Sequence, residues 1–160
     1  MEKAALKEHR RHSTADKPFS YYISNIPEYF PNAPMHWHKE FELNVILEGE
    51  GDFVTGDIHF TAYKGDIVLT PPDMLHAVYQ HDDKRCVYDP LDLDGSMLGS
   101  RDNDRAADAF ITPLISGAYS IETHITPEHC YYSELLTTAE NMINAAKGDT
   151  PLLDMLIKSE

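Results

Sequence analysis

Short apolar runs separated by Gly, Pro and Asp follow one another from Phe19 onwards. From Phe41 to Leu47 apolar and polar positions largely alternate, which predicts a strand with one buried face. Glu48 to Gly51 predicts a turn, with a return strand that begins at Phe53. Further strands are predicted at residues 58–63, 67–70, 76–80 and 86–89. Many short strands at this spacing are typical of a mainly β sandwich or barrel.

The N-terminal and connecting segments have a different texture. Residues 1–18 are polar and mixed in charge, which predicts a flexible N-terminal arm. Residues 91–108 are rich in Asp, Gly, Ser and Asn and predict a loop.

The C-terminal part has helical periodicity. Thr126 and Pro127 suit the N-cap and first position of a helix that continues with apolar residues at helical spacing until Gly148. A second helix is expected after Pro151, and its apolar pattern still continues when the chain ends. We therefore expect an arm (1–18), a barrel (19–125) and a helical segment (126–160), in a polypeptide that extends further.

Composition narrows the class of protein. The 160 residues carry a formal net charge of −14 at pH 7, a surface that repels phosphate backbones, so DNA contact is expected only through another segment. Cys86 and Cys130 form no CxxC pattern, which favours a reducing cytosol over a disulfide framework. No apolar run is long enough to span a bilayer and no signal-peptide pattern opens the chain, so a cytoplasmic protein without membrane partners is expected.

Three candidate metal ligands lie close together in the sequence. His36, His38 and Glu42 share parity, so a single continuous strand would direct all three side chains to one face. His76, which follows a proline-rich turn, is the expected fourth member. Three imidazoles and a carboxylate suit a divalent transition metal, and the imidazole-rich set favours zinc or nickel. The alternative is a hydrogen-bonded polar interior that holds an ordered water or an effector in place of a metal.

The same residues resemble the two motifs of the cupin superfamily. The first motif, G-x5-H-x-H-x3,4-E-x6-G, is matched by the three candidate ligands above and by Gly49. The second motif, G-x5-P-x-G-x2-H-x3-N, is matched by Gly65, Pro71 and His76. Phe30, Asp73 and Gln80 depart from the pattern without removing a would-be ligand. This resemblance implies a cupin-type double-stranded β-barrel, or jelly roll, with C-terminal α-helices.

From about Phe19 to Glu160 the chain is similar to the N-terminal sensory domain of AraC-type transcription regulators. That resemblance implies a barrel that binds a small-molecule effector such as a sugar, and helices that pair subunits into a homodimer. It also implies that DNA is contacted by a C-terminal helix-turn-helix domain that is absent here. Tyr22 lies just before the barrel entry, and Asn44 and Gln80 share the parity of the metal ligands, so these three are the expected effector contacts.

The apolar stripe of the helical segment has two interpretations. Residues at helical spacing could form a seam against a twin helix, or all of them could pack on the barrel. The expected seam consists of Tyr132, Leu135, Ala139, Met142 and Ala146.

Three functional hypotheses follow. The favoured one is a non-enzymatic sensory module. The second is a cupin metalloenzyme, an isomerase or dioxygenase, that uses the same three histidines and glutamate. The third is a plain dimerisation module with an empty barrel.

Overall fold

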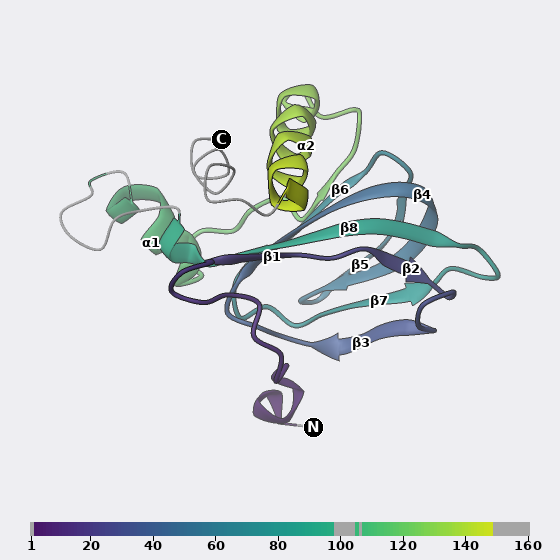
Figure 1. The fold of residues 1–160 in the computed structure, drawn as a ribbon, viewed down its shortest axis with the longest axis horizontal. Helices are drawn as coiled ribbons and strands as arrows, with labels where there is room; N and C mark the ends of the chain where they lie inside the picture. Colours follow the sequence, from purple (N-terminus) through teal and green to yellow (C-terminus); the bar gives the residue numbers. More distant parts are fainter. Residues whose placement is uncertain (1, 98–104, 106, 149–160) are drawn as a thin grey trace.

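The structure, a computed structural model, describes residues 2–97, 105 and 107–148 (Figure 1). The fold is a mainly β, cupin-type barrel followed by helices, as predicted. Its strands are β1 (Phe19–Tyr21), β2 (Ser24–Ile26), β3 (Asn32–His36), β4 (Phe41–Thr55), β5 (Ile58–Tyr63), β6 (Ile67–Thr70), β7 (His76–Gln80), β8 (Cys86–Leu93) and β9 (His124–Ile125). Its α-helices are α1 (Thr112–Ile115) and α2 (Tyr132–Gly148), and single helical turns lie at Lys3–Leu6, Gly95–Met97 and Ala107–Ile111.

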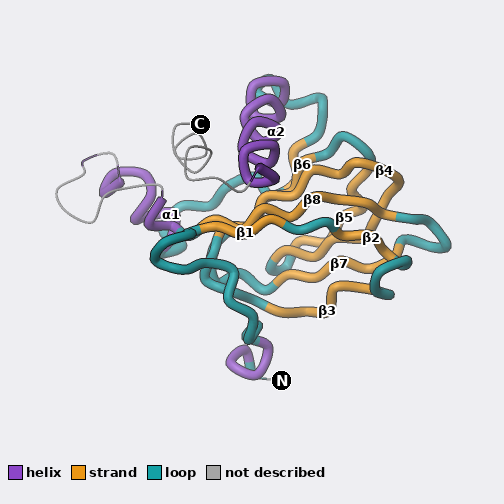
Figure 2. The backbone as a smooth tube through the Cα atoms, viewed as in Figure 1, coloured by secondary structure: helices purple, strands orange, loops and turns teal. Residues whose placement is uncertain are grey.

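All the strand pairs are antiparallel, and they form two facing halves (Figure 2). One half contains β1, β2, β8, the first part of β4, β6 and β9. The other half contains β3, β7, the second part of β4 and β5. Since β4 belongs to both, it is the strand that joins the halves.

The predicted turn at Glu48 to Gly51 is wrong, because β4 runs through it as a single strand of 15 residues. Its register against β8 shifts between Ile46 and Glu48, and Gly49 has a φ of 74°. A Cβ at this glycine would lie 1.7 Å from the carbonyl oxygen of Arg85, so only glycine fits there. The glycine-rich sequence therefore makes a bulge, which bends the strand from one half to the other.

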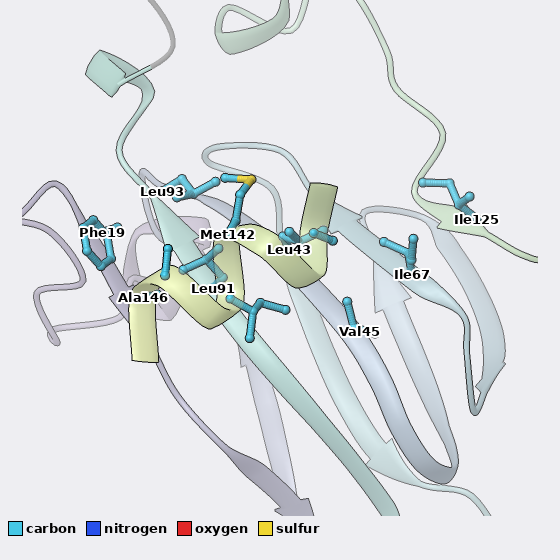
Figure 3. Packing of buried hydrophobic residues seen from close by; sticks show 12 residues of the cluster. Phe19, Leu43, Val45, Ile67, Leu91, Leu93, Ile125, Met142 and Ala146 are labelled. Carbon is cyan, nitrogen blue, oxygen red and sulfur yellow. The ribbon is translucent and has the colours of Figure 1, made fainter. Parts of the chain in front are cut away.

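Two clusters of buried side chains stabilise the barrel. One lies between the two halves and includes Ile46, Phe53 and Tyr88. The other lies between the first half and α2 and includes Leu43, Leu91 and Met142 (Figure 3). Leu43 and Val45 of β4 face α2, whereas Glu42 and Asn44 have the opposite parity and face the interior.

Helix α2 begins later than predicted and buries the face that was expected to be free. Residues 126–131 form turns, in which the backbone N–H of Thr126 donates to Nδ1 of His129 at 3.0 Å.

The expected dimer seam is corrected, since its five residues pack on the sheet. Ala139, Met142 and Ala146 are buried in the cluster beneath the helix, and Tyr132 and Leu135 lie at its edge. The amphipathic helix has one apolar stripe, and this stripe buries the apolar outer face of the sheet. The helix predicted after Pro151 lies outside the described residues.

The N-terminal arm, predicted to be mobile, lies against the barrel in this structure. The N–H of Glu8 donates to the carbonyl oxygen of Trp37 at 3.0 Å, and the N–H of Trp37 donates to that of Leu6 at 3.1 Å. The indole of Trp37 also donates to the carbonyl oxygen of Lys3 at 2.7 Å. The start of the arm lies on the β3 side of the barrel, opposite α2 (Figure 1). The loop predicted from residue 91 starts later, because β8 continues to Leu93.

Among the residues that the structure describes, no helix is long and apolar enough to cross a membrane.

The packing of α2 predicts the effect of truncating its buried face. Met142→Ala is expected to lower the free energy of unfolding by about 2–4 kcal/mol, because it leaves a cavity against the sheet. Asn144→Ala, on the exposed face of the same helix, is the control and should change it by less than about 0.5 kcal/mol. Urea unfolding followed by circular dichroism measures both values. Similar small losses for the two variants would contradict this packing.

Candidate metal centre and effector cleft

The structure brings together the four residues predicted as metal ligands. The ring centroids of His36 and His76 are 4.1 Å apart, and those of His38 and His76 are 4.9 Å apart. Oε2 of Glu42 lies 3.4 Å from Nε2 of His38 and 3.7 Å from Nε2 of His76. Each of the three histidines offers one ring nitrogen, and these three nitrogen atoms all lie within 4.8 Å of one another.

The reason given for this convergence is wrong, because no single strand carries His36, His38 and Glu42. His36 is the last residue of β3, His38 lies in the loop that follows, and Glu42 is near the start of β4. His76 opens β7 and is paired in register with His36. The cluster is therefore assembled from two strand ends, a loop and a neighbouring strand.

The distances in the cluster suit a metal ion. For bonds of about 2.1 Å, the ligand atoms of a tetrahedral site are about 3.4 Å apart, close to the two distances from Glu42. Nδ1 of His36 donates to the carbonyl oxygen of Pro34 at 2.7 Å, and Nδ1 of His76 donates to that of Met74 at 2.9 Å. These bonds leave Nε2 of each ring as the unprotonated atom, an arrangement common for metal-bound histidines. Nε2 of His76 is buried and has no hydrogen-bond partner among the described residues.

The electrostatics of two members of the cluster, Glu42 and His76, suit metal ligands. Burial tends to raise the pKa of Glu42, but the neighbouring His76 and His38 outweigh it and hold that pKa below its usual value. Burial lowers the pKa of His76, with Glu42 acting against it. An ionised glutamate and a neutral histidine are the forms that bind divalent metals.

Glu8, His12 and Asp92 extend this cluster, although none was predicted to be part of it. His12 donates from Nε2 to Oε2 of Glu8 at 2.9 Å, and its Nδ1 lies 2.6 Å from Oδ2 of Asp92. The rings of His12 and His38 are 4.8 Å apart. Burial lowers the pKa of His12, but Asp92 and Glu8 outweigh it and raise this pKa to about 11. Burial raises the pKa of Asp92 to about 6, with His12 acting against it. At neutral pH an imidazolium therefore lies between two carboxylates.

Only one of these three residues left a usable signal in the sequence. Asp92 is paired in register with Glu42, and extending the predicted strand beyond Pro90 would have placed it in the interior. Glu8 and His12 are four residues apart, but no pattern of apolar positions indicates where the arm runs.

A cleft of about 650 Å³ opens beside the cluster. Its lining includes His36, Glu42, His76, Tyr22, Tyr88 and Asp92. The volume is within the range of small-molecule sites.

The three predicted effector contacts lie at different places. Tyr22 lines the cleft, and its hydroxyl is 3.2 Å from Nδ1 of His12. Asn44 does not line the cleft: its amide donates to Oε1 of Glu42 at 2.7 Å, and its own Oδ1 is buried without a hydrogen-bond partner among the described residues. Gln80 is a correction, because it does not line the cleft and its amide donates to the carbonyl oxygen of Lys84 at 3.1 Å. It shares the parity of His76 but lies too far along β7.

Several solved structures are similar to part of this chain. A predicted oxalate decarboxylase from Thermotoga maritima is 22% identical, with a TM-score of 0.42, over 46% of this chain and 64% of its own. The DMSP lyase DddQ from Ruegeria pomeroyi is 23% identical, with a TM-score of 0.42, over 54% of this chain and 41% of its own. A cupin 2 conserved barrel domain protein from Salinispora arenicola is 18% identical, with a TM-score of 0.43, over 69% and 81%.

Sequence comparisons give a more direct result. An uncharacterized HTH-type transcriptional regulator of Bacillus subtilis, YdeC, is 27% identical over 84 residues, which are 52% of this chain and 29% of that protein. The chain thus spans less than a third of this relative. The AraC-like ligand binding domain family matches residues 18–107, more than half of the chain. On this match, the protein belongs to the family of AraC-like ligand-binding domains.

Proposed function

We propose that this domain senses a small-molecule effector for an AraC-type transcription regulator. The observation that carries the proposal is a cleft, lined by His76 and Asp92 among others, near buried polar atoms that have no hydrogen-bond partner in the described part of the chain. These atoms are Nδ1 of His38, Oδ1 of Asn44, Nε2 of His76 and Oδ1 of Asp92. Leaving such an atom unsatisfied costs about 1–3 kcal/mol, so a bound molecule that pairs with them gains affinity.

The types of these atoms favour an effector rich in hydroxyl groups, such as a sugar. Oδ1 of Asp92, a residue that lines the cleft, accepts hydrogen bonds only, and hydroxyl groups donate them. Tyr22 adds an aromatic ring and a hydroxyl at the edge of the cleft. In this proposal Tyr22 contacts the effector, and Asn44 holds Glu42 in place at the cleft through its hydrogen bond.

We further propose that His36, His38, His76 and Glu42 hold a divalent transition metal, with zinc or nickel favoured by the three imidazoles. The distances and the unpartnered Nε2 of His76 support this assignment. A metal ion at this place would supply a Lewis acid that binds an oxygen of the effector.

We expect the metal to bind through the histidines of the cluster. In calorimetric titration of metal-free protein with Zn²⁺, His76→Ala should weaken binding by at least about 100-fold, because it removes a ligand. His59→Ala, on the exposed side of β5, is the control and should bind as the wild type does. Equal affinities for the two variants would refute the assigned ligand set.

We expect an effector to raise the melting temperature of the protein. At 100 times its dissociation constant, a ligand that binds only the folded state adds about 2.7 kcal/mol to the free energy of unfolding. A thermal-shift screen of sugars and other metabolites would identify it.

Two neighbouring tyrosines then test the effector site. Tyr22→Phe should weaken effector binding about tenfold, the value of one hydrogen bond. Tyr21→Phe is the control, because the hydroxyl of Tyr21 donates to Asp89 on the other side of the strand. Flat melting curves across the screen would support a module with an empty barrel.

Strand β8 is the proposed route from the cleft to the helix. Tyr88 and Asp92 of this strand line the cleft, whereas Leu91 and Leu93 pack beneath α2. We propose that effector binding changes the position of α2 in a cytoplasmic homodimer, and so the spacing of helix-turn-helix domains elsewhere in the polypeptide. The net charge of −14 argues against DNA contact by this domain itself.

A cupin metalloenzyme is the second candidate, because the same cluster would also suit a catalytic metal. Ionised Glu42 beside neutral His76 is a ligand set that could activate a substrate oxygen. Turnover of members of a metabolite panel with added iron, manganese or nickel would favour the enzyme. Stoichiometric binding without turnover would favour the sensor.

A further inference from the structure

The N-terminal arm brings a further carboxylate to the edge of the metal cluster. Oε2 of Glu8 lies 3.6 Å from Nε2 of His36. This distance is close to the 3.7 Å between Glu42 and His76, two of the ligands proposed above. Because Nδ1 of His36 already donates to Pro34, its Nε2 is the atom available to a metal on the side of Glu8.

The position of Glu8 is set from two directions. Its backbone N–H is held by the carbonyl oxygen of Trp37, the residue between His36 and His38. Its carboxylate accepts from His12, which in turn contacts the buried Asp92. Glu8 thus lies over the cluster through contacts that involve both its backbone and its side chain.

We propose that Glu8 is an additional ligand of the metal, so that metal binding and docking of the arm on the barrel stabilise each other. This inference rests on the metal site proposed above and adds a residue from outside the barrel. By reciprocity, the factor by which Glu8 strengthens metal binding equals the factor by which the metal favours the docked arm.

The chain contains its own reporters of arm docking. Lys7 and Arg10 are exposed trypsin sites on either side of Glu8, and cleavage there requires the arm to leave the barrel. Trp37 is the single tryptophan of the protein and donates to the arm at Lys3, so its fluorescence reports the same contact. Zn²⁺ is the suitable probe, since it has no redox chemistry of its own.

The experiment measures Zn²⁺ affinity and tryptic cleavage of the arm in the wild-type chain of 160 residues and in its variants Glu8→Gln and Glu2→Gln. Glu2 is exposed on the same arm, so Glu2→Gln is the matched control for the loss of one charge. For Glu8→Gln we expect affinity to fall at least about tenfold. Saturating Zn²⁺ should slow cleavage at Lys7 and Arg10 of wild type and of Glu2→Gln by a similar factor, and should not slow it in Glu8→Gln.

The outcomes separate this inference from the proposed metal site. If wild type and Glu8→Gln bind Zn²⁺ equally and Zn²⁺ does not slow cleavage of the arm, the inference is overturned and the barrel site stands. If wild type does not bind Zn²⁺, both fail. If affinity falls equally in Glu8→Gln and Glu2→Gln, charge alone is responsible and the inference is again overturned. Melting curves of metal-free protein show whether each variant is folded.

Discussion

Mutual compensation of charge inside the barrel is the constraint on which the site depends. Four imidazoles and three carboxylates, from Glu8, His12, His36, His38, Glu42, His76 and Asp92, lie in contact with one another. A buried charge without a partner costs several kcal/mol, so each carboxylate requires its imidazole. Removing one member leaves another uncompensated, which explains why the group has to be treated as a unit.

The polar cluster is possible because the apolar stabilisation lies elsewhere. At the start of β4 the interior positions are Glu42 and Asn44, and the apolar side chains of that stretch face α2. The bulge reverses which positions of β4 face the interior: before it Ile46, at an even position, lies between the halves, and after it Phe53, at an odd position, does so. The space between the halves is apolar there. One end of the barrel is thus free for chemistry while the other end and the outer face hold the fold together.

The sequence was sufficient to predict the barrel and its four candidate ligands, because both depend on local alternation and spacing. Proximity was predicted correctly for His36, His38, Glu42 and His76 even though the single-strand argument was wrong, since the motif spacing contains the loop that the argument ignored. The bulge at Gly49 was taken for a turn, because glycine-rich sequence serves both structures.

Other features depend on contacts that no local pattern records. Gln80 has the correct parity, but it lies too far along β7 to reach the cleft. Parity tells which face of a strand a side chain is on, and not how far along the strand the site lies. The face of α2 that carries Met142 could have met a second helix or the sheet, and the uncovered outer face of the sheet decided between them. His12 is part of the cluster because the arm happens to follow Trp37, a long-range backbone contact with no periodic signature.

Strand β8 connects the interior cluster to the helix, and its two faces have the same kind of chemistry. On the inner face Asp92 is paired with His12 of the arm. On the outer face Asp89, which is also buried, accepts from Lys147 at the end of α2 and from Tyr21. A stretch of four residues in one strand thus carries two buried carboxylates, one held by His12 of the arm and the other by Lys147 of α2. Because neither carboxylate can move without weakening its ion pair, a shift of β8 caused by events in the cleft changes the energy of both the arm and the helix contact. This physical continuity makes a sensory role more natural for the domain than a purely structural one.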